Sequence, residues 1–120
     1  MSRNINPGYH PKAAKRISEN YSSIITEISQ AIEKNDVVIV GMAQNPHIKQ
    51  AKKLLEKDGI KYKYLEYGSY FSGWKSRLAI KIWSGWPTFP QIFVRGKLLG
   101  GASDLEESIA VGEFQSLINE

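Results

Sequence analysis

The sequence contains no cysteine in its 120 residues. The absence of thiols excludes disulfide bonds, thiolate nucleophiles and thiolate-ligated metal sites within this chain. Its two histidines, His10 and His47, are too few and too far apart to suggest a metal site. The sequence also lacks an apolar run long enough to span a bilayer, and its polar opening residues do not resemble a signal peptide. We therefore expect a cytoplasmic protein without a membrane partner.

Composition places few other restrictions on the chain. Hydrophobic residues make up 42% and charged residues 23%, which are ordinary values for a single globular domain with its own core. The net charge is +4, but the 16 lysines and arginines are dispersed over the predicted helix faces. This dispersion disfavours nucleic acid as the natural partner. A scaffold that contacts some other anionic partner through basic helices stays open as an alternative.

The segment Val37–Leu55 organises the chain. It begins with the short β-branched run Val37–Val40, which predicts a buried strand. The chain then turns and enters an amphipathic helix, for which Asn45 is a suitable N-cap and Pro46 a suitable first residue. Because free N–H groups and the helix dipole attract anions, such a strand–helix junction is where we expect a ligand.

Periodicity and turn signals predict the remaining elements. Residues 1–10 are expected to be an irregular lead-in, and residues 11–34 to form one bent helix or two consecutive helices. The predicted order is ααβαβαββαα, an α/β thioredoxin arrangement whose four-stranded mixed sheet has a parallel first pair and an antiparallel second pair. We divide the chain into an N-terminal helical extension, 1–35, and a domain, 36–120. The later elements are expected at Ile60–Tyr67 (strand), Phe71–Trp83 (helix), Gln91–Arg95 (strand), Leu98–Leu99 (strand), Ser103 or Asp104 to Ala110 (helix) and Phe114–Ile118 (helix).

Three motifs between Asp36 and Ile118 resemble the glutaredoxin family. The sequence NPHIKQAKKLL, at 45–55, resembles the family's redox motif, Cys-Pro-aromatic-Cys, followed by a lysine-rich amphipathic helix. WPTFPQ, at 86–91, matches a loop of the monothiol, CGFS-type branch, and GGASDL, at 100–105, matches the family's GGxSDL.

The resemblance implies a groove that binds glutathione. Phe89–Pro90 is expected to be a cis peptide whose backbone pairs with a cysteinyl group, and the region of Gly100–Asp104 to receive the γ-glutamyl group. Arg77 would meet the glycyl carboxylate, with Lys81 nearby. Without the family, the glycines predict only a turn, and Arg77 and Lys81 only a solvated helix face. The implied ligand-binding residues are Arg77, Thr88, Phe89, Pro90, Gly100, Gly101, Ser103 and Asp104.

The sequence also departs from the family pattern. Asn45 occupies the position of the nucleophilic cysteine, Ile48 that of the second cysteine of dithiol members, and Met42 that of a common lysine. An amide cannot form the mixed disulfide needed for thiol–disulfide exchange, nor can it ligate an iron–sulfur cluster. We therefore predict no catalytic residue, no metal and no cluster.

The leading hypothesis is a glutaredoxin-like pseudoenzyme that binds glutathione, a thiol-containing peptide or a protein partner. The first alternative is a glutaredoxin-type oxidoreductase or a glutathione-dependent enzyme with atypical chemistry. The second is the anionic-partner scaffold. Aromatic residues exposed near the groove would favour partner binding, and we expect these to be Trp86 and one or two of Tyr67, Tyr70 and Trp74. The sequence does not define an oligomeric state.

Overall fold

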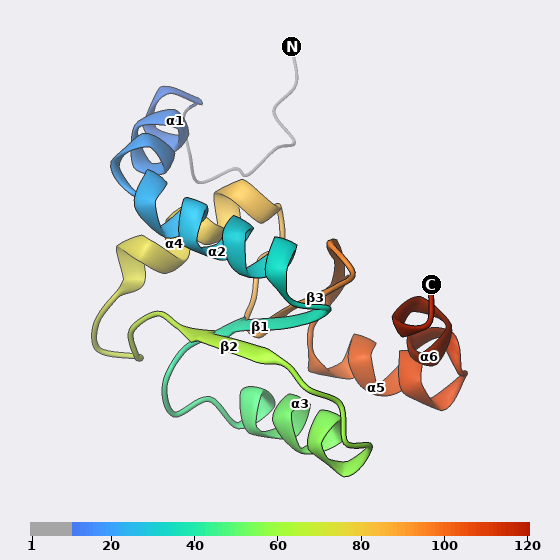
Figure 1. Ribbon diagram of the computed structural model, residues 1–120. Coiled ribbons are helices and arrows are strands. Elements are labelled where there is room, and N and C mark those ends of the chain that lie inside the picture. The colour runs from blue at the N-terminus through green and yellow to red at the C-terminus, as the bar shows by residue number, and fades with distance from the viewer. Residues whose placement is uncertain (1–10) are drawn as a thin grey trace.

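A four-stranded mixed sheet forms the centre of the computed structural model, which describes residues 11–120 (Figure 1). The predicted lead-in at 1–10 lies outside the described residues. The strand order is β2-β1-β3-β4, with β1 and β2 parallel and β3 antiparallel to both β1 and β4. This topology confirms the predicted thioredoxin arrangement. The strands are β1 Val37–Gly41, β2 Lys63–Glu66, β3 Gln91–Val94 and β4 Lys97–Gly100.

Helices cover both faces of the sheet. The order of elements is the predicted ααβαβαββαα, with two separate helices before β1. Figure 1 shows α2 and α4 on one side of the sheet and α3 and α5 on the other. No helix among residues 11–120 is both long and apolar enough to cross a membrane. The helices are α1 Pro11–Asn20, α2 Ser22–Lys34, α3 Pro46–Lys57, α4 Trp74–Ser84, α5 Ala102–Ala110 and α6 Glu113–Ile118.

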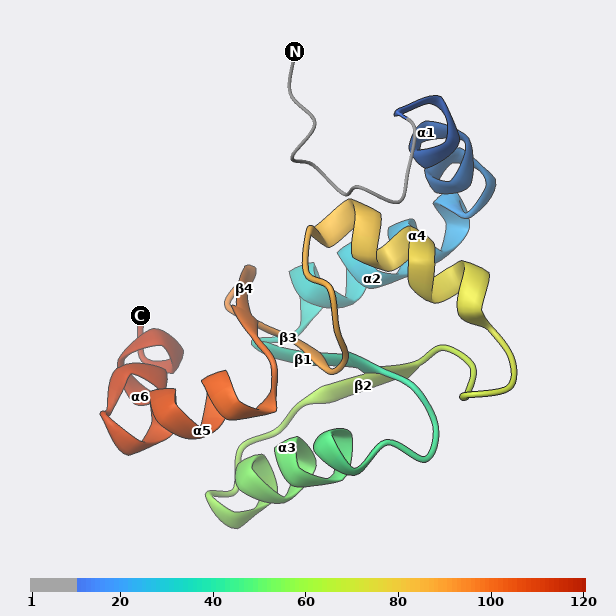
Figure 2. The same ribbon diagram turned by 180° about the vertical axis from the view of Figure 1, so that it is seen from behind.

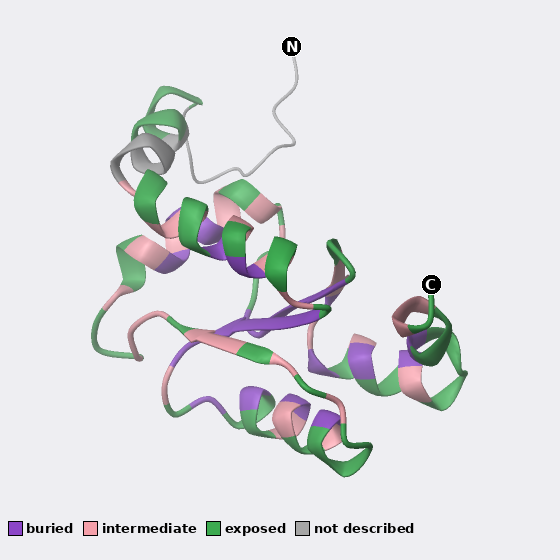
Figure 3. Cartoon of the chain, in the orientation of Figure 1, coloured by how far each residue is buried: buried purple, intermediate pink, exposed green. Residues whose placement is uncertain are grey.

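The alternation of side chains along β1 creates two cores, one on each face. Successive strand residues point to opposite faces, so a strand covered on both sides must be apolar throughout. Val37 and Ile39 pack with buried residues of α3, α5 and α6. Val38 and Val40 pack with buried residues of α2 and α4. Every residue of β1 is buried, as the colouring in Figure 3 shows, which confirms the buried strand predicted from its sequence.

Helix α2 belongs to the second of these cores. Its Ile28 is fully buried and its Ala31 nearly so, and both pack with Val38 and Val40 of β1. Helix α1 packs instead on α4, which both views of the ribbon show (Figure 2). The division of the chain at residues 35 and 36 stays a prediction.

Helix α4 differs from its prediction. We expected it to begin at Phe71, which would be one of its apolar positions, but it begins at Trp74, after Gly73 in the left-handed conformation. Phe71 is 93% exposed and Trp74 60% exposed, while Arg77, Ala79 and Ile80 form the buried side. On this side, Arg77 donates hydrogen bonds to backbone oxygens of the loop that precedes the helix.

Candidate functional site

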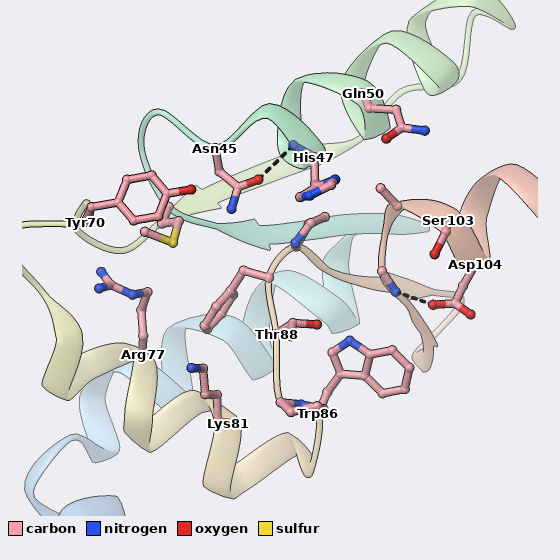
Figure 4. Close-up of a pocket in the computed structure, with 16 residues that line it drawn as sticks. Asn45, His47, Gln50, Tyr70, Arg77, Lys81, Trp86, Thr88, Ser103 and Asp104 are labelled. Atoms are coloured by element: carbon pink, nitrogen blue, oxygen red, sulfur yellow. Dashed lines mark hydrogen bonds between the residues drawn. The ribbon is translucent and has the colours of Figure 1, made fainter.

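A pocket of about 670 Å³ opens between the start of α3, helix α4, the loop before β3 and the start of α5 (Figure 4). Its lining includes seven of the eight predicted ligand-binding residues, which the fold brings together from segments far apart in the sequence. The eighth, Gly100, is buried and does not line the pocket. Ligand binding by these residues stays a prediction. The seven are Arg77, Thr88, Phe89, Pro90, Gly101, Ser103 and Asp104.

Asn45 closes the N-terminus of α3. Its side-chain oxygen accepts hydrogen bonds from the backbone N–H of His47 at 2.8 Å and of Ile48 at 3.3 Å. This confirms the predicted N-cap, with Pro46 as the first helical residue. The amide oxygen therefore accepts hydrogen bonds from two of the N–H groups that we expected to attract an anion. A ligand at this junction meets the amide of Asn45 rather than an open helix terminus.

Ile48 has become part of the core at the position of a second cysteine. It is 3% exposed and packs so closely on Gly41 that a Cβ added to that glycine would lie 2.4 Å from Ile48 Cδ1. Met42, in turn, is 7% exposed and contributes its side chain to the pocket wall. Apolar packing thus replaces the thiol and the cation that the family pattern places at these two positions.

Arg77 supports the loop beside the pocket. Its Nη1 donates to the backbone oxygens of Tyr67 at 3.0 Å and Ser72 at 2.8 Å, and the residue is only 9% exposed. The alternative of a solvated helix face is therefore wrong for Arg77. Lys81, one turn further along α4, is half-buried and has its Nζ 5.7 Å from the ring centroid of Phe89. Both cations line the pocket, so they make this wall electropositive.

The loop before β3 forms the floor of the pocket. Its Phe89–Pro90 peptide is cis, as the resemblance implied. The loop is fixed by Gln91, whose Nε2 donates to the backbone oxygen of Trp86 at 3.0 Å. Phe89 is directed into the core with α2 and α4, whereas Thr88 is exposed. The backbone at 88–90 is thus held in place at the pocket surface.

The start of α5 forms the wall opposite the cations. We expected Ser103 or Asp104 as N-cap, but the N-cap is Gly101, and Asp104 is the third helical residue. Asp104 Oδ2 accepts from the N–H of Gly101 at 2.9 Å, which satisfies one N–H group that the helix itself cannot. Gly100 makes room for this contact, since a Cβ there would lie 2.5 Å from Asp104 Oδ2. The first N–H groups of α5 and a carboxylate therefore meet at one end of the pocket.

Several lining residues were not among the predicted ligand-binding residues. Tyr70 is 59% exposed beside the pocket, in agreement with the expectation that some aromatic residues stay exposed there. Gln50 lies on the same side of α3 as His47, three residues earlier, and this helical spacing was the signal that could have revealed it. Trp86 brings a buried Nε1 with no hydrogen-bond partner in the described part of the chain. The described residues contain no group of three or more His, Asp or Glu side chains suited to a metal ion.

Comparisons with known proteins agree with this architecture. The glutaredoxin family model matches residues 37–99. A glutaredoxin-like protein of Dictyostelium discoideum is 48% identical over 96 residues, which cover 80% of this chain and 78% of that protein. Glutaredoxin-C8 of Oryza sativa subsp. japonica is 30% identical over 94 residues, which cover 77% of this chain and 69% of that protein.

Solved structures show the same fold. Oxidized glutaredoxin 2 from Chlamydomonas reinhardtii superposes with a TM-score of 0.70 at 26% identity, covering 82% of this chain and 94% of that one. The buckwheat glutaredoxin–glutathione complex superposes with a TM-score of 0.74 at 23% identity, covering 84% of this chain and 92% of that one. The family-model match over residues 37–99 and the 48% identity to the Dictyostelium discoideum protein show that the chain belongs to the glutaredoxin family.

Proposed function

We propose that this protein binds glutathione, or a peptide that resembles it, without performing thiol–disulfide exchange. The observation that carries the proposal is the pocket itself, in which a cationic wall, a fixed backbone segment and a helix N-terminus with a carboxylate converge. Glutathione has a carboxylate at one end, a cysteinyl backbone in the middle and a zwitterionic γ-glutamyl group at the other. The order of charges in the pocket is complementary to the order in this ligand.

Each part of the ligand has a matching protein group. Lys81 and the remaining donors of Arg77 attract the glycyl carboxylate. The backbone at Phe89–Pro90 pairs with the cysteinyl backbone in the manner of an added strand. The N–H groups at the start of α5 receive the γ-glutamyl carboxylate, and the carboxylate of Asp104 attracts its ammonium group. The buckwheat relative, whose structure is that of a glutathione complex, supports the choice of glutathione as the ligand.

The absence of a thiol argues against the oxidoreductase alternative. The chain has no cysteine, and Asn45 has a structural role as the cap of α3. A glutathione-dependent reaction would have to take its only thiol from the ligand. A disulfide-reduction assay with added glutathione distinguishes the two functions. We expect no activity above background for the natural chain and a gain for Asn45→Cys, whereas equal activity in both would overturn the binding-only proposal.

Calorimetric titration with reduced glutathione tests the binding itself. We expect saturable binding by the natural protein and clearly weaker binding by Lys81→Ala, which removes a pocket cation. Lys97→Ala serves as the matched control, because it removes the same charge from an exposed residue of β4 that lies outside the pocket. Absence of binding at millimolar glutathione, or equal losses in both variants, would reject the proposal.

A second candidate function, contact with an anionic macromolecule, is favoured by one observation. Lys49, Lys53 and Lys57 are exposed at four-residue spacing along α3 and line a shallow groove. Like charges at this spacing repel one another, and the acidic residue of the helix, Glu56, accepts a hydrogen bond from Tyr62 instead. Replacing the three lysines with glutamine should abolish any salt-sensitive binding to DNA or RNA. Absence of binding by the natural protein at low salt would remove this candidate.

A further inference from the structure

The amide of Asn45 presents a hydrogen-bond donor to the pocket at the position where a thiolate would present an acceptor. Because Oδ1 accepts from the N–H groups of His47 and Ile48, the NH₂ group must be the part that is directed away from the helix. Figure 4 shows this nitrogen directed into the pocket, with the labelled residues of α4 and α5 beyond it.

This donor has no protein partner among the described residues. The oxygen of Asn45 is engaged in the two cap bonds, while Nδ2 makes no hydrogen bond with any described residue. The side chain cannot rotate to use the nitrogen elsewhere without breaking both cap bonds. A ligand that supplies an acceptor at this point gains a hydrogen bond that a ligand without one cannot make.

The surrounding charges favour the same kind of ligand group. Across the pocket from Asn45, helix α4 contributes the cations Arg77 and Lys81, while the carboxylate of Asp104 belongs to α5 (Figure 4). An amide donor in a pocket lined by these two cations stabilises a negatively charged acceptor and gives nothing to an alkyl group. A thiolate attached to the protein at residue 45 would have filled this place; here the ligand has to fill it.

We infer that Asn45 makes the pocket selective for a glutathione-type ligand whose sulfur carries an anionic acceptor, a thiolate or an oxidised sulfur, over one whose sulfur is alkylated. This inference rests on the proposed function, because it is the placement of the cysteinyl backbone at Phe89–Pro90 that directs the sulfur toward Asn45. No bond is made or broken, and Asn45 acts as a specificity-determining residue.

Two probes that differ only at sulfur test the inference. Glutathione sulfonate and S-methylglutathione are titrated against the natural protein at one pH and ionic strength. We expect the sulfonate to bind about tenfold more tightly or better, the ratio that one charge-assisted hydrogen bond supports. Equal affinities would overturn the inference and leave the proposed function standing. Failure of both probes and of reduced glutathione to bind would reject the proposed function and this inference together.

Two variants separate the contribution of the Asn45 amide to ligand selectivity from the contribution of the pocket cations. Asn45→Asp and Asn45→Ser keep an oxygen that can cap α3, so both should fold, and circular dichroism checks this. We expect the preference for the sulfonate to fall about tenfold in Asn45→Ser, and to fall further in Asn45→Asp, where a carboxylate repels the probe. A preference that survives in both variants would show that Arg77 and Lys81 alone select the anion, and would overturn the inference.

Discussion

The side-chain oxygen of Asn45 lies 2.8 Å from the backbone nitrogen of His47 and accepts its hydrogen bond at the start of α3. At the position of the family nucleophile, this protein therefore has a helix cap. The same residue contributes to stability through its oxygen and, by our inference, to ligand choice through its nitrogen. Variants of Asn45 should separate the two contributions.

Asn45→Ala should lower the free energy of unfolding by about 1 kcal/mol, because two N–H groups of α3 lose their acceptor. Asn45→Asp should remain close to the natural protein, since aspartate is an equally good N-cap. Urea denaturation followed by circular dichroism measures both. An alanine variant as stable as the natural protein would show that the cap contributes nothing.

Arg77→Lys should destabilise the loop 67–73 even though it keeps the charge. A lysine cannot reproduce the guanidinium donor that bridges the backbone oxygens of Tyr67 and Ser72, and a lost hydrogen bond to a charged group costs about 1.5–3 kcal/mol. Hydrogen exchange should show faster opening of this loop. Lys81→Ala, on the same helix, is the control and should leave the exchange rates unchanged.

Gly100→Ala should disrupt the start of α5. The residue has a φ of 131°, and a Cβ would collide with the carboxylate of Asp104 that holds the N–H of Gly101. Gly85→Ala is a matched control, because its φ of 76° is also positive but no atom lies within 4 Å of the added Cβ. We expect the control to cost about 1 kcal/mol from backbone conformation alone, and Gly100→Ala to cost more and to weaken glutathione binding. Equal costs would contradict the account of the γ-glutamyl end.

Alkaline pH should destabilise the protein through three tyrosines in and directly beside β2. Burial, followed by the hydrogen bond that its hydroxyl donates to Glu56, raises the pKa of Tyr62 to about 12. Burial likewise raises the pKa values of Tyr64 and Tyr67, whose hydroxyls donate to Glu66 and Glu27.

The sign of the effect follows from these shifts. An unfolded tyrosine has a pKa of about 10, so the folded state holds its protons more tightly, and the stabilisation is complete below about pH 10. It should be lost as the pH rises from about 10 through 12, the folded pKa of Tyr62. Absorbance titration of the phenolates measures this, and Glu56→Gln should lower the pKa of Tyr62. An unchanged titration in that variant would contradict the assigned cause.

The fold followed closely from the sequence because its strongest signals were local. The β-branched run of β1 and the Asn45–Pro46 start of α3 each predict their own structure, and both are observed. The start of helix α4 was predicted wrongly because periodicity assigns apolar residues such as Phe71 to the interior. Phe71 is nevertheless exposed, whereas Arg77 is buried and donates hydrogen bonds to backbone oxygens of the preceding loop.

The candidate site was only partly predictable from the sequence. The motif residues of the loop before β3 and of α5 came from resemblance, and the fold brings them to one pocket. Gln50 could have been found from its helical spacing to His47, whereas the choice of Tyr70 among the candidate exposed aromatic residues depends on how distant segments meet. The N-cap of α5 was assigned to Ser103 or Asp104 because their side chains suit that role, whereas Gly101 occupies it and Asp104 caps from the third helical position.

Titration of the ¹⁵N-labelled protein with reduced glutathione, followed by NMR, tests glutathione binding in the pocket most directly. We expect saturable shifts of the amide signals of Thr88, Gly101 and Asp104, with no change at Lys97 on the exposed edge of the sheet. Absence of shifts at those three residues at millimolar glutathione would contradict binding in this pocket.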